Sequence, residues 1–217
     1  MTLRLVIGNK NYSSWSLRPW IAMKVAGIEF EETVIPLYEP GSRDRILEVS
    51  PTGKVPALID GDIRVWETLA ILDYLVDRYP DTGFWPKDQA ARAHARSVAS
   101  EMHAAFAPLR RLCPMNMRRP VKARELTPEV AADVARIDSL WTECRTRFGA
   151  GGPFLFGGFG AADAMFAPVV SRLHTYDIAV GALSRRYMEA VMELPAWHEW
   201  QAAAEREPWV MAGNEVD

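Results

Sequence analysis

The sequence predicts an α+β protein with two domains, a small β-rich domain followed by an all-helical one. Three observations lead to this fold class. Short alternating or β-branched apolar runs occur within residues 2–66. From about Lys87 onward, apolar residues recur at helical spacing, and a segment with proline and glycine at 80–86 separates the two patterns. The 217 residues suffice for two small domains that bury a substantial core.

The order of elements in the first domain is that of a thioredoxin-like fold. Alternation of leucine and isoleucine with other residues marks the first strand, and the Asp60-Gly61-Asp62 turn marks a hairpin. Glu67 in the first turn of the last helix suits the helix dipole. The predicted elements are strand 2–7, helix 21–26, strand 30–37, a short polar helix at 41–50, the hairpin 57–66 and a helix from Glu67-Thr68 to Tyr79.

A serine-rich turn, residues 11–16, joins the first strand to the first helix. Pro19 lacks an N–H group, and a helix tolerates this only in its first turn. With Ser16 as the cap, Pro19 occupies the third helical position, so the helix is expected to begin near residue 15 or 16. Ser13 and Ser14 then lie in the turn. The free N–H groups and positive dipole at the helix start favour an anionic atom beside them.

The second domain is predicted to consist of helices only. Thr127-Pro128-Glu129 combines a cap with proline at the first helical position, and Asp163 can reach back to the cap backbone of its helix. The expected helices are 90–112, broken at Pro108 or Pro114, then 127–148, 160–176, 182–194 and 195–206. These patterns place the domains at 1–80 and 89–217, with a linker at 81–88.

Composition excludes several classes of function. The net charge of −3 gives no reason to expect a nucleic acid or an anionic membrane as partner. The N-terminus does not resemble a signal peptide, and no apolar run approaches the ~18 residues that span a bilayer. Cys113 and Cys144 are far apart and are expected to be reduced thiols in a cytoplasmic protein. The histidines show no metal-ligand spacing, so no metal is expected.

Five motifs occur in this order along the chain: residues 13–22, Lys54-Val55-Pro56, Glu67-Thr68-Leu69-Ala70-Ile71, Trp85-Pro86 and Gly160-Ala161-Ala162-Asp163. On these motifs the chain resembles the cytosolic glutathione transferases over nearly its whole length. The resemblance is to the serine-type classes, because Ser13 aligns with the catalytic serine of the zeta and tau classes. Trp15 stands where the zeta motif has cysteine, and Gly160 where the family usually has serine or threonine.

The resemblance implies that the first domain binds glutathione as co-substrate. Ser13 would donate a hydrogen bond to the glutathione thiolate, with Ser14 as its competitor and a plain turn residue as the other interpretation. A cis peptide bond at Val55-Pro56 would present the Val55 backbone to the cysteinyl residue, and an ordinary trans-proline turn is the other interpretation. Lys54 would meet the glycine carboxylate or remain solvated.

The resemblance implies that Glu67 and Thr68 bind the γ-glutamyl end of glutathione. Thr68 would hold its carboxylate through the hydroxyl and N–H groups, and Glu67 would pair with its ammonium group. The alternative for Glu67 is a first-turn acid that only suits the dipole.

The acceptor pocket is harder to predict. An apolar pocket formed by Trp15 and by side chains of the helical domain is one interpretation, and core packing is the simpler one for each of them. Arg18 is expected in a structural ion pair, and the basic run from Arg110 to Arg124 as a solvated loop or an attractor of anionic electrophiles at the mouth of the site. The candidates from the helical domain are Met102, Phe106, Met115 and Phe166.

The function that follows from the resemblance is that of a glutathione transferase acting on an apolar electrophile. Two alternatives stay open: a glutathione-dependent isomerase of the maleylacetoacetate isomerase type, and a non-catalytic glutathione-binding or structural protein on the same fold. Detoxification would be the role of the transferase, and the family implies a homodimer.

Overall fold

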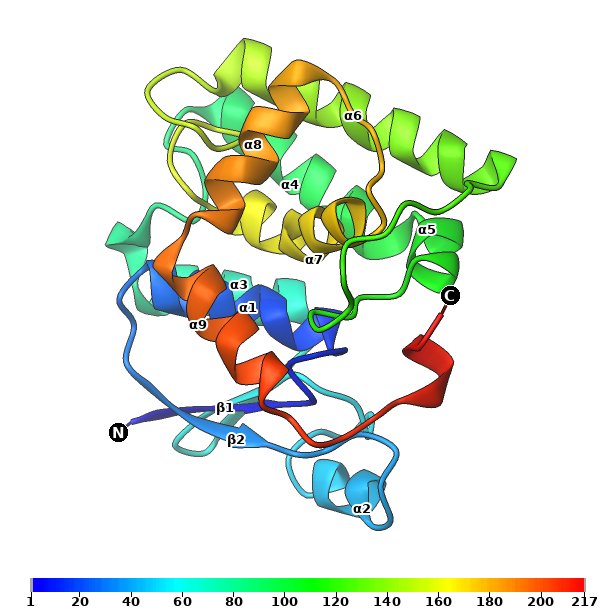
Figure 1. The fold of residues 1–217 in the computed structure, drawn as a ribbon. Helices are drawn as coiled ribbons and strands as arrows, with labels where there is room; N and C mark the ends of the chain where they lie inside the picture. Colours follow the sequence, from blue (N-terminus) through cyan, green and yellow to red (C-terminus); the bar gives the residue numbers. More distant parts are fainter. Residues whose placement is uncertain (1, 217) are drawn as a thin grey trace.

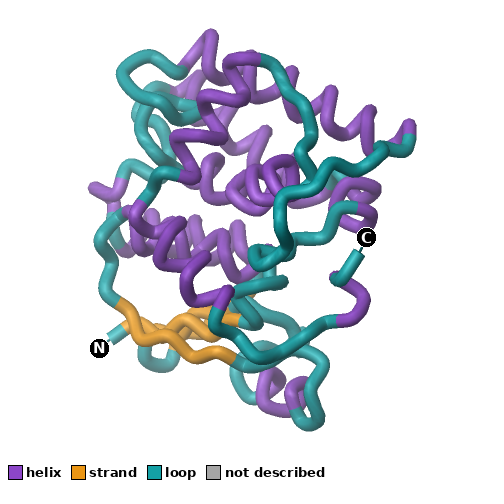
Figure 2. The backbone as a smooth tube through the Cα atoms, viewed as in Figure 1, coloured by secondary structure: helices purple, strands orange, loops and turns teal. Residues whose placement is uncertain are grey.

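The computed structural model describes residues 2–216 and confirms the two-part α+β architecture (Figure 1). A four-stranded sheet has the order β2-β1-β3-β4, with β1 parallel to β2 and antiparallel to β3. Figure 2 shows the strands gathered near one end of the molecule, with one short helix on one side and the remaining helices on the other. The strands are β1 (Leu3–Ile7), β2 (Phe30–Val34), β3 (Ala57–Asp60) and β4 (Ile63–Trp66).

Helices cover both faces of this sheet. α1 (Ser14–Val25) and α3 (Thr68–Arg78) pack against one face, whose apolar side chains include Leu5 and Ile7. α2 (Ser42–Leu47) lies on the other face, where Ile46 joins Val6 in a separate small cluster. The alternation of side chains along β1 therefore supplies two cores, one on each face of the sheet.

The second domain is helical within the described residues. α7 lies at its centre, and of its residues only His174 is exposed, as expected for a helix that is apolar nearly all round. The helices are α4 (Gln89–Ala104), α5 (Ala107–Leu112), α6 (Pro128–Phe148), α7 (Ala161–Thr175), α8 (Ala182–Met192) and α9 (Pro195–Glu205); short 3-10 turns are η1 (Pro80–Thr82) and η2 (Ala212–Asn214).

The predicted helix 90–112 is two helices. The chain breaks at Ala105 and Phe106, and Phe106 adopts a left-handed conformation with φ of 60°. Pro108 then falls at the second position of α5, where a missing N–H removes no helical bond. The break thus precedes the proline that the sequence points to.

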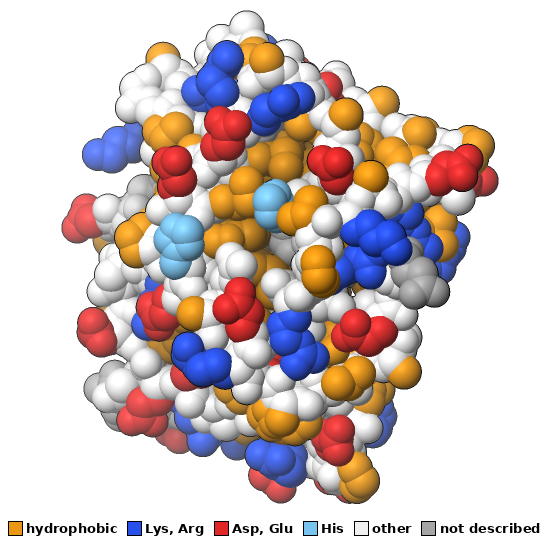
Figure 3. Space-filling view, viewed as in Figure 1, with side chains coloured by type: hydrophobic (Ala, Val, Ile, Leu, Met, Phe, Trp, Pro, Cys, Tyr) orange, Lys and Arg blue, Asp and Glu red, His pale blue; other side chains and the backbone are white. Residues whose placement is uncertain are grey.

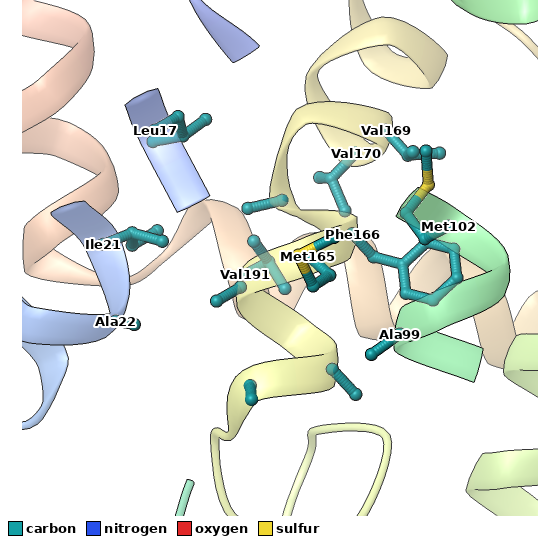
Figure 4. Packing of buried hydrophobic residues seen from close by; sticks show 14 of the residues in the cluster. Leu17, Ile21, Ala22, Ala99, Met102, Met165, Phe166, Val169, Val170 and Val191 are labelled. Atoms are coloured by element: carbon teal, nitrogen blue, oxygen red, sulfur yellow. The ribbon is translucent and has the colours of Figure 1, made fainter. Parts of the chain in front are cut away.

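The two domains share one continuous core. Figure 4 shows Leu17 and Ile21 of α1 on one side of α7, and Met102 of α4 beside the ring of Phe166. Asp163, at the start of α7, accepts from the Gly160 N–H at 2.8 Å, which confirms the predicted capping contact. Because α1 is held between the sheet and α7, the serine turn at its start has a fixed place.

The segment after α9, residues 206–216, returns across the first domain (Figure 1, red). The Glu207 carboxylate accepts from the Lys10 N–H at 2.6 Å and the Asn11 N–H at 3.0 Å. Near its end, Glu215 accepts from the Tyr12 hydroxyl at 2.5 Å and from the Asn116 side chain at 3.0 Å. The C-terminal segment is therefore bound to the residues that lead into the serine turn.

Candidate functional site

The serine turn begins the helix earlier than the sequence suggests. Ser13, not Ser16, is the N-cap of α1, and Ser14 is already helical. The Ser13 side chain makes no capping bond; its Oγ lies 2.7 Å from Ser16 Oγ instead. Within the described chain, the N–H groups of Trp15 and Ser16 have no hydrogen-bond acceptor. The helix start thus offers free donors beside the Ser13 and Ser14 hydroxyls.

Pro19 is consequently the sixth residue of α1, inside the helix. It cannot donate to the Trp15 carbonyl four residues earlier, so that carbonyl lacks its helical partner. The Thr68 hydroxyl, which is fully buried, donates to this carbonyl at 3.2 Å. The hydroxyl proton of Thr68 is therefore committed to α1, and the group it offers as a donor to a ligand is its backbone N–H.

The Val55-Pro56 peptide bond is cis, which confirms that prediction. Within residues 2–216, neither the N–H nor the C=O of Val55 makes a hydrogen bond. An unpaired, partly exposed backbone donor and acceptor on one residue can pair with an extended peptide as a neighbouring strand does. Lys54 beside it is exposed.

The start of α3 is open to an anion. Glu67 is the N-cap, its side chain makes no capping bond, and the first turn of the helix contains no acidic residue. Glu67 adopts φ of 68° and ψ of 129°, a costly conformation for a residue other than glycine. Free N–H groups and the helix dipole at this point favour a carboxylate.

Two adjoining cavities bring these segments together. The smaller has a volume of about 300 Å³, and the larger, about 650 Å³, contains Ser13 and Ser14 in its wall. Trp15, Lys54, Val55 and Arg110 line both. Pro56, Glu67 and Thr68 line the smaller cavity, and the C-terminal segment contributes Met211 and Asn214 to the larger.

Three arginines, Arg18, Arg110 and Arg172, lie beside the two cavities or line them. Arg18 is completely buried, with its guanidinium 4.1 Å from the Trp15 ring, and the Arg110 guanidinium lies 5.6 Å from the same ring. Arg172, from α7, lines the larger cavity. None of the ion pairs within residues 2–216 includes any of the three. The expected ion pair of Arg18 is therefore wrong: its Nε donates to the Met165 carbonyl at 2.9 Å.

Burial and mutual repulsion lower the pKa of two of these arginines. Burial, reinforced by the charges of Arg172 and Arg110, lowers the pKa of Arg18 well below its usual value. Burial and the charge of Arg110 lower the pKa of Arg172 to about 10. The Arg172 Nε has no partner within the described chain. Among the described residues, Glu39 is the one carboxylate side chain that lines the larger cavity, against four basic side chains, so its wall carries an excess of positive charge that favours an anion.

Three residues that line the cavities are not among the site residues predicted from the sequence. His103 of α4 lies with its ring 5.2 Å from that of Trp15 and lines the smaller cavity. Arg172 and Met211 reach the larger cavity from α7 and the C-terminal segment. Periodicity identifies the helices but not which of their residues face a cavity made by another domain.

The four acceptor candidates from the helical domain are core residues. Met102, Phe106, Met115 and Phe166 are all buried in the shared core, and none of them lines either cavity. Figure 4 shows Met102 and Phe166 packed against each other. Trp15 is the one candidate acceptor residue that lines the cavities.

Other classes of site find no support in residues 2–216. These residues contain no cluster of three or more histidine, cysteine or acidic side chains suited to a metal. Their helices include none with the length and apolar character of a membrane span. Both cysteines are buried free thiols. Figure 3 shows acidic and basic side chains interspersed over one face, around a hollow with apolar side chains.

Comparison with known proteins gives matches to glutathione S-transferases along most of the chain. The family model of the glutathione S-transferase N-terminal domain matches residues 12–78, and that of the C-terminal domain matches residues 127–203. Glutathione S-transferase Z2 of Arabidopsis thaliana is 27% identical over 92% of each chain. A probable maleylacetoacetate isomerase of Caenorhabditis elegans is 34% identical over 101 residues, which are 46% of this chain and 47% of that protein.

Solved structures show the same fold. A glutathione transferase homolog from Burkholderia with bound glutathione superposes with a TM-score of 0.73 at 22% identity, covering 94% of this chain and 98% of that one. A bacterial zeta-class maleyl pyruvate isomerase gives a TM-score of 0.67 at 19% identity, with 94% and 99% covered. The chain belongs to the cytosolic glutathione S-transferase family, and it is an enzyme of that family, as its sequence predicts.

Proposed function

We propose that this glutathione S-transferase binds glutathione along the smaller cavity with its sulfur beside Ser13, and that its acceptor carries a carboxylate. The Val55 backbone pairs with the cysteinyl residue, and Lys54 meets the glycine carboxylate. The γ-glutamyl carboxylate lies at the start of α3, and Glu67 pairs with the ammonium group. Thr68 contributes its N–H, since its hydroxyl proton is bound to Trp15.

The thiol of glutathione is activated by hydrogen bonding and by positive charge. A free thiol with pKa near ~8.5 is mostly protonated at neutral pH. Ser13, with Ser14 as its competitor, donates to the sulfur, and the start of α1 and the nearby arginines stabilise the thiolate. Both hydroxyls belong to the larger cavity, where the acceptor binds. The thiolate then attacks an acceptor held against it.

The unpaired arginines are the observation that carries the choice of acceptor. Neither Arg110 nor Arg172 is in an ion pair within residues 2–216, although Glu39 lines the same cavity; a purely apolar electrophile would leave both unpaired, and a carboxylate supplies a counter-charge. This favours the isomerase alternative over a general transferase of apolar compounds. In that reaction the thiolate adds to an unsaturated acid and leaves again after rotation about the saturated bond.

A matched pair of acceptors tests this function. Ethacrynic acid and its methyl ester present the same electrophilic carbon and differ in one charge, and chlorodinitrobenzene serves as a neutral reference. We expect the enzyme to prefer the acid by a larger factor than the uncatalysed reaction does, and to isomerise maleylacetone. Equal enhancement of acid and ester would overturn the anionic acceptor, and failure to bind a glutathione column would overturn the whole proposal.

We also propose that the protein is a cytoplasmic homodimer. The family supports both properties, and exposed large apolar residues such as Trp66 and Tyr38 on the first domain support a partner surface. Sedimentation of a single 24.4 kDa species would contradict the dimer.

A further inference from the structure

Ser16 is fully buried, directly behind the proposed thiol-binding hydroxyl. Its Oγ accepts from the Gly8 N–H at 3.0 Å and lies 2.7 Å from Ser13 Oγ. Both serines are buried, but only Ser13 lines the larger cavity. A chain of three groups therefore runs from the end of β1, through Ser16, to the cavity.

The direction of the Ser13–Ser16 bond depends on what fills the cavity. Each hydroxyl has one proton, and within residues 2–216 each has the other hydroxyl as its acceptor. A thiolate next to Ser13 takes the Ser13 proton into its own hydrogen bond. Ser13 Oγ then has a free lone pair toward Ser16, and the Ser16 hydroxyl can donate to it while still accepting from Gly8.

We propose that Ser16 is a positioning residue for thiol activation, donating to Ser13 Oγ so that the Ser13 proton is directed at the glutathione sulfur. This inference rests on the proposed role of Ser13. The thiol proton leaves to solvent, Ser13 keeps its own proton, and no covalent bond to the protein forms. Hydrogen bonds in such a chain polarise one another, so the last donor is stronger than an isolated hydroxyl. The Gly8 N–H fixes the Ser16 oxygen from behind.

The pKa of the bound glutathione thiol, followed by the ultraviolet absorbance of the thiolate, is the direct readout. We expect Ser16→Ala to lower the fraction of thiolate at neutral pH by about threefold, less than the about tenfold loss in Ser13→Ala. The KM for glutathione should change little, because Ser16 touches no part of the peptide. Ser16→Thr, which keeps the hydroxyl, should restore the thiolate fraction.

Two controls separate this role from a structural one. Ser171→Ala removes another buried hydroxyl, outside both cavities, and should leave the thiol pKa unchanged. In the double variant with Ser13→Ala, the replacement of Ser16 should have no further effect, because Ser16 acts only through Ser13. Thermal unfolding of each variant shows whether the fold is kept.

The outcomes distinguish this inference from the function on which it rests. If Ser13→Ala shifts the thiol pKa and Ser16→Ala does not, the role of Ser16 is overturned while that of Ser13 stands. If Ser16→Ala shifts the pKa equally with and without Ser13, Ser16 acts independently and the inference is overturned. If only Ser14→Ala shifts the pKa, the assignment of Ser13 fails, and that of Ser16 fails with it.

Discussion

Thr68 donates its hydroxyl to the Trp15 carbonyl, an acceptor that Pro19 leaves without a helical donor. The bond joins the start of α3 to the first turn of α1, so it connects the segment proposed to hold the γ-glutamyl group to the segment proposed to hold the sulfur. A proline inside a helix usually costs stability because it leaves a carbonyl unpaired. In this protein the Trp15 carbonyl is paired with Thr68 instead, and this bond connects the two halves of the proposed binding site.

Replacing Thr68 by valine should therefore loosen the peptide site. The change keeps the shape of the side chain but leaves the Trp15 carbonyl, in a partly buried place, without a donor, which costs about 1 kcal/mol of unfolding free energy. We expect the KM for glutathione to rise and the acceptor KM to change less. Thr68→Ser keeps the hydroxyl and is the matched control. A KM for glutathione that is unchanged in Thr68→Val would show that the bond does not position the site.

The same pair of residues shows where prediction from sequence ends. Proline chemistry alone places the cap at Ser16, because that register keeps Pro19 in the first turn. The structure begins the helix at Ser14, since a threonine more than fifty positions away compensates for the missing donor. Local rules cannot anticipate a partner that only the tertiary fold supplies.

Replacing Arg172 should change the preference for charged acceptors. Arg172→Met removes a buried charge that faces the larger cavity and whose Nε has no partner within the described residues. A hydrogen bond to a charged group contributes about 1.5–3 kcal/mol, so kcat/KM for ethacrynic acid should fall by about thirtyfold, and that for its methyl ester by much less. Arg172→Lys, which keeps the charge, should lose less. An equal loss for acid and ester would point to a packing role for Arg172 instead.

Asp163 should make the stability of the fold depend on pH. Burial raises its pKa to about 7, although the N–H groups of Leu155 and Gly160 donate to it at 3.0 and 2.8 Å. In the unfolded chain the group titrates near ~3.9. Between these values the folded state holds more protons than the unfolded state. The contribution of Asp163 to the free energy of unfolding is therefore fully present below about pH 4 and is lost as the pH rises through about 7.

The Asp163→Asn variant tests this. The variant should remove the fall in the free energy of unfolding with rising pH, which amounts to up to about 4 kcal/mol in the wild type. It should also lose one backbone hydrogen bond, which lowers its stability equally at every pH. Urea denaturation of both proteins between about pH 4 and about pH 8 measures it, and the difference between the two curves removes the contribution of the other carboxylates. Two parallel curves would mean that Asp163 keeps an ordinary pKa in the folded state.

The fold and the lining of the smaller cavity follow from the sequence far better than the lining of the larger cavity does. Alternation, turns and caps identify the elements because they act locally, and the Val55-Pro56 bond is cis as the resemblance implies. The acceptor cavity depends instead on which residues of α5, α7 and the C-terminal segment face α1. Met102 and Phe166 have the apolar character of pocket residues, but that character suits a core equally well.

The C-terminal segment should set the size of acceptor that the enzyme accepts. Met211 and Asn214 line the larger cavity, and this part of the segment is held on either side by Glu207 and Glu215. Since these carboxylates bind the Lys10 and Asn11 amides and the Tyr12 hydroxyl, the wall cannot move away without breaking several hydrogen bonds. A fixed wall discriminates by shape, so shortening Met211 should change selectivity between acceptors rather than the activation of the thiol.

Met211→Ala should raise kcat/KM for bulky acceptors relative to small ones by about tenfold, the range that a change of a few carbon atoms in a pocket produces. The pKa of the bound glutathione thiol should stay as in the wild type, because Met211 is not part of the serine turn. Val210→Ala is the matched control, since Val210 is 66% exposed and lines neither cavity. The same shift in selectivity in both variants would mean that the segment acts through its general flexibility, and that Met211 is not a wall of the acceptor site.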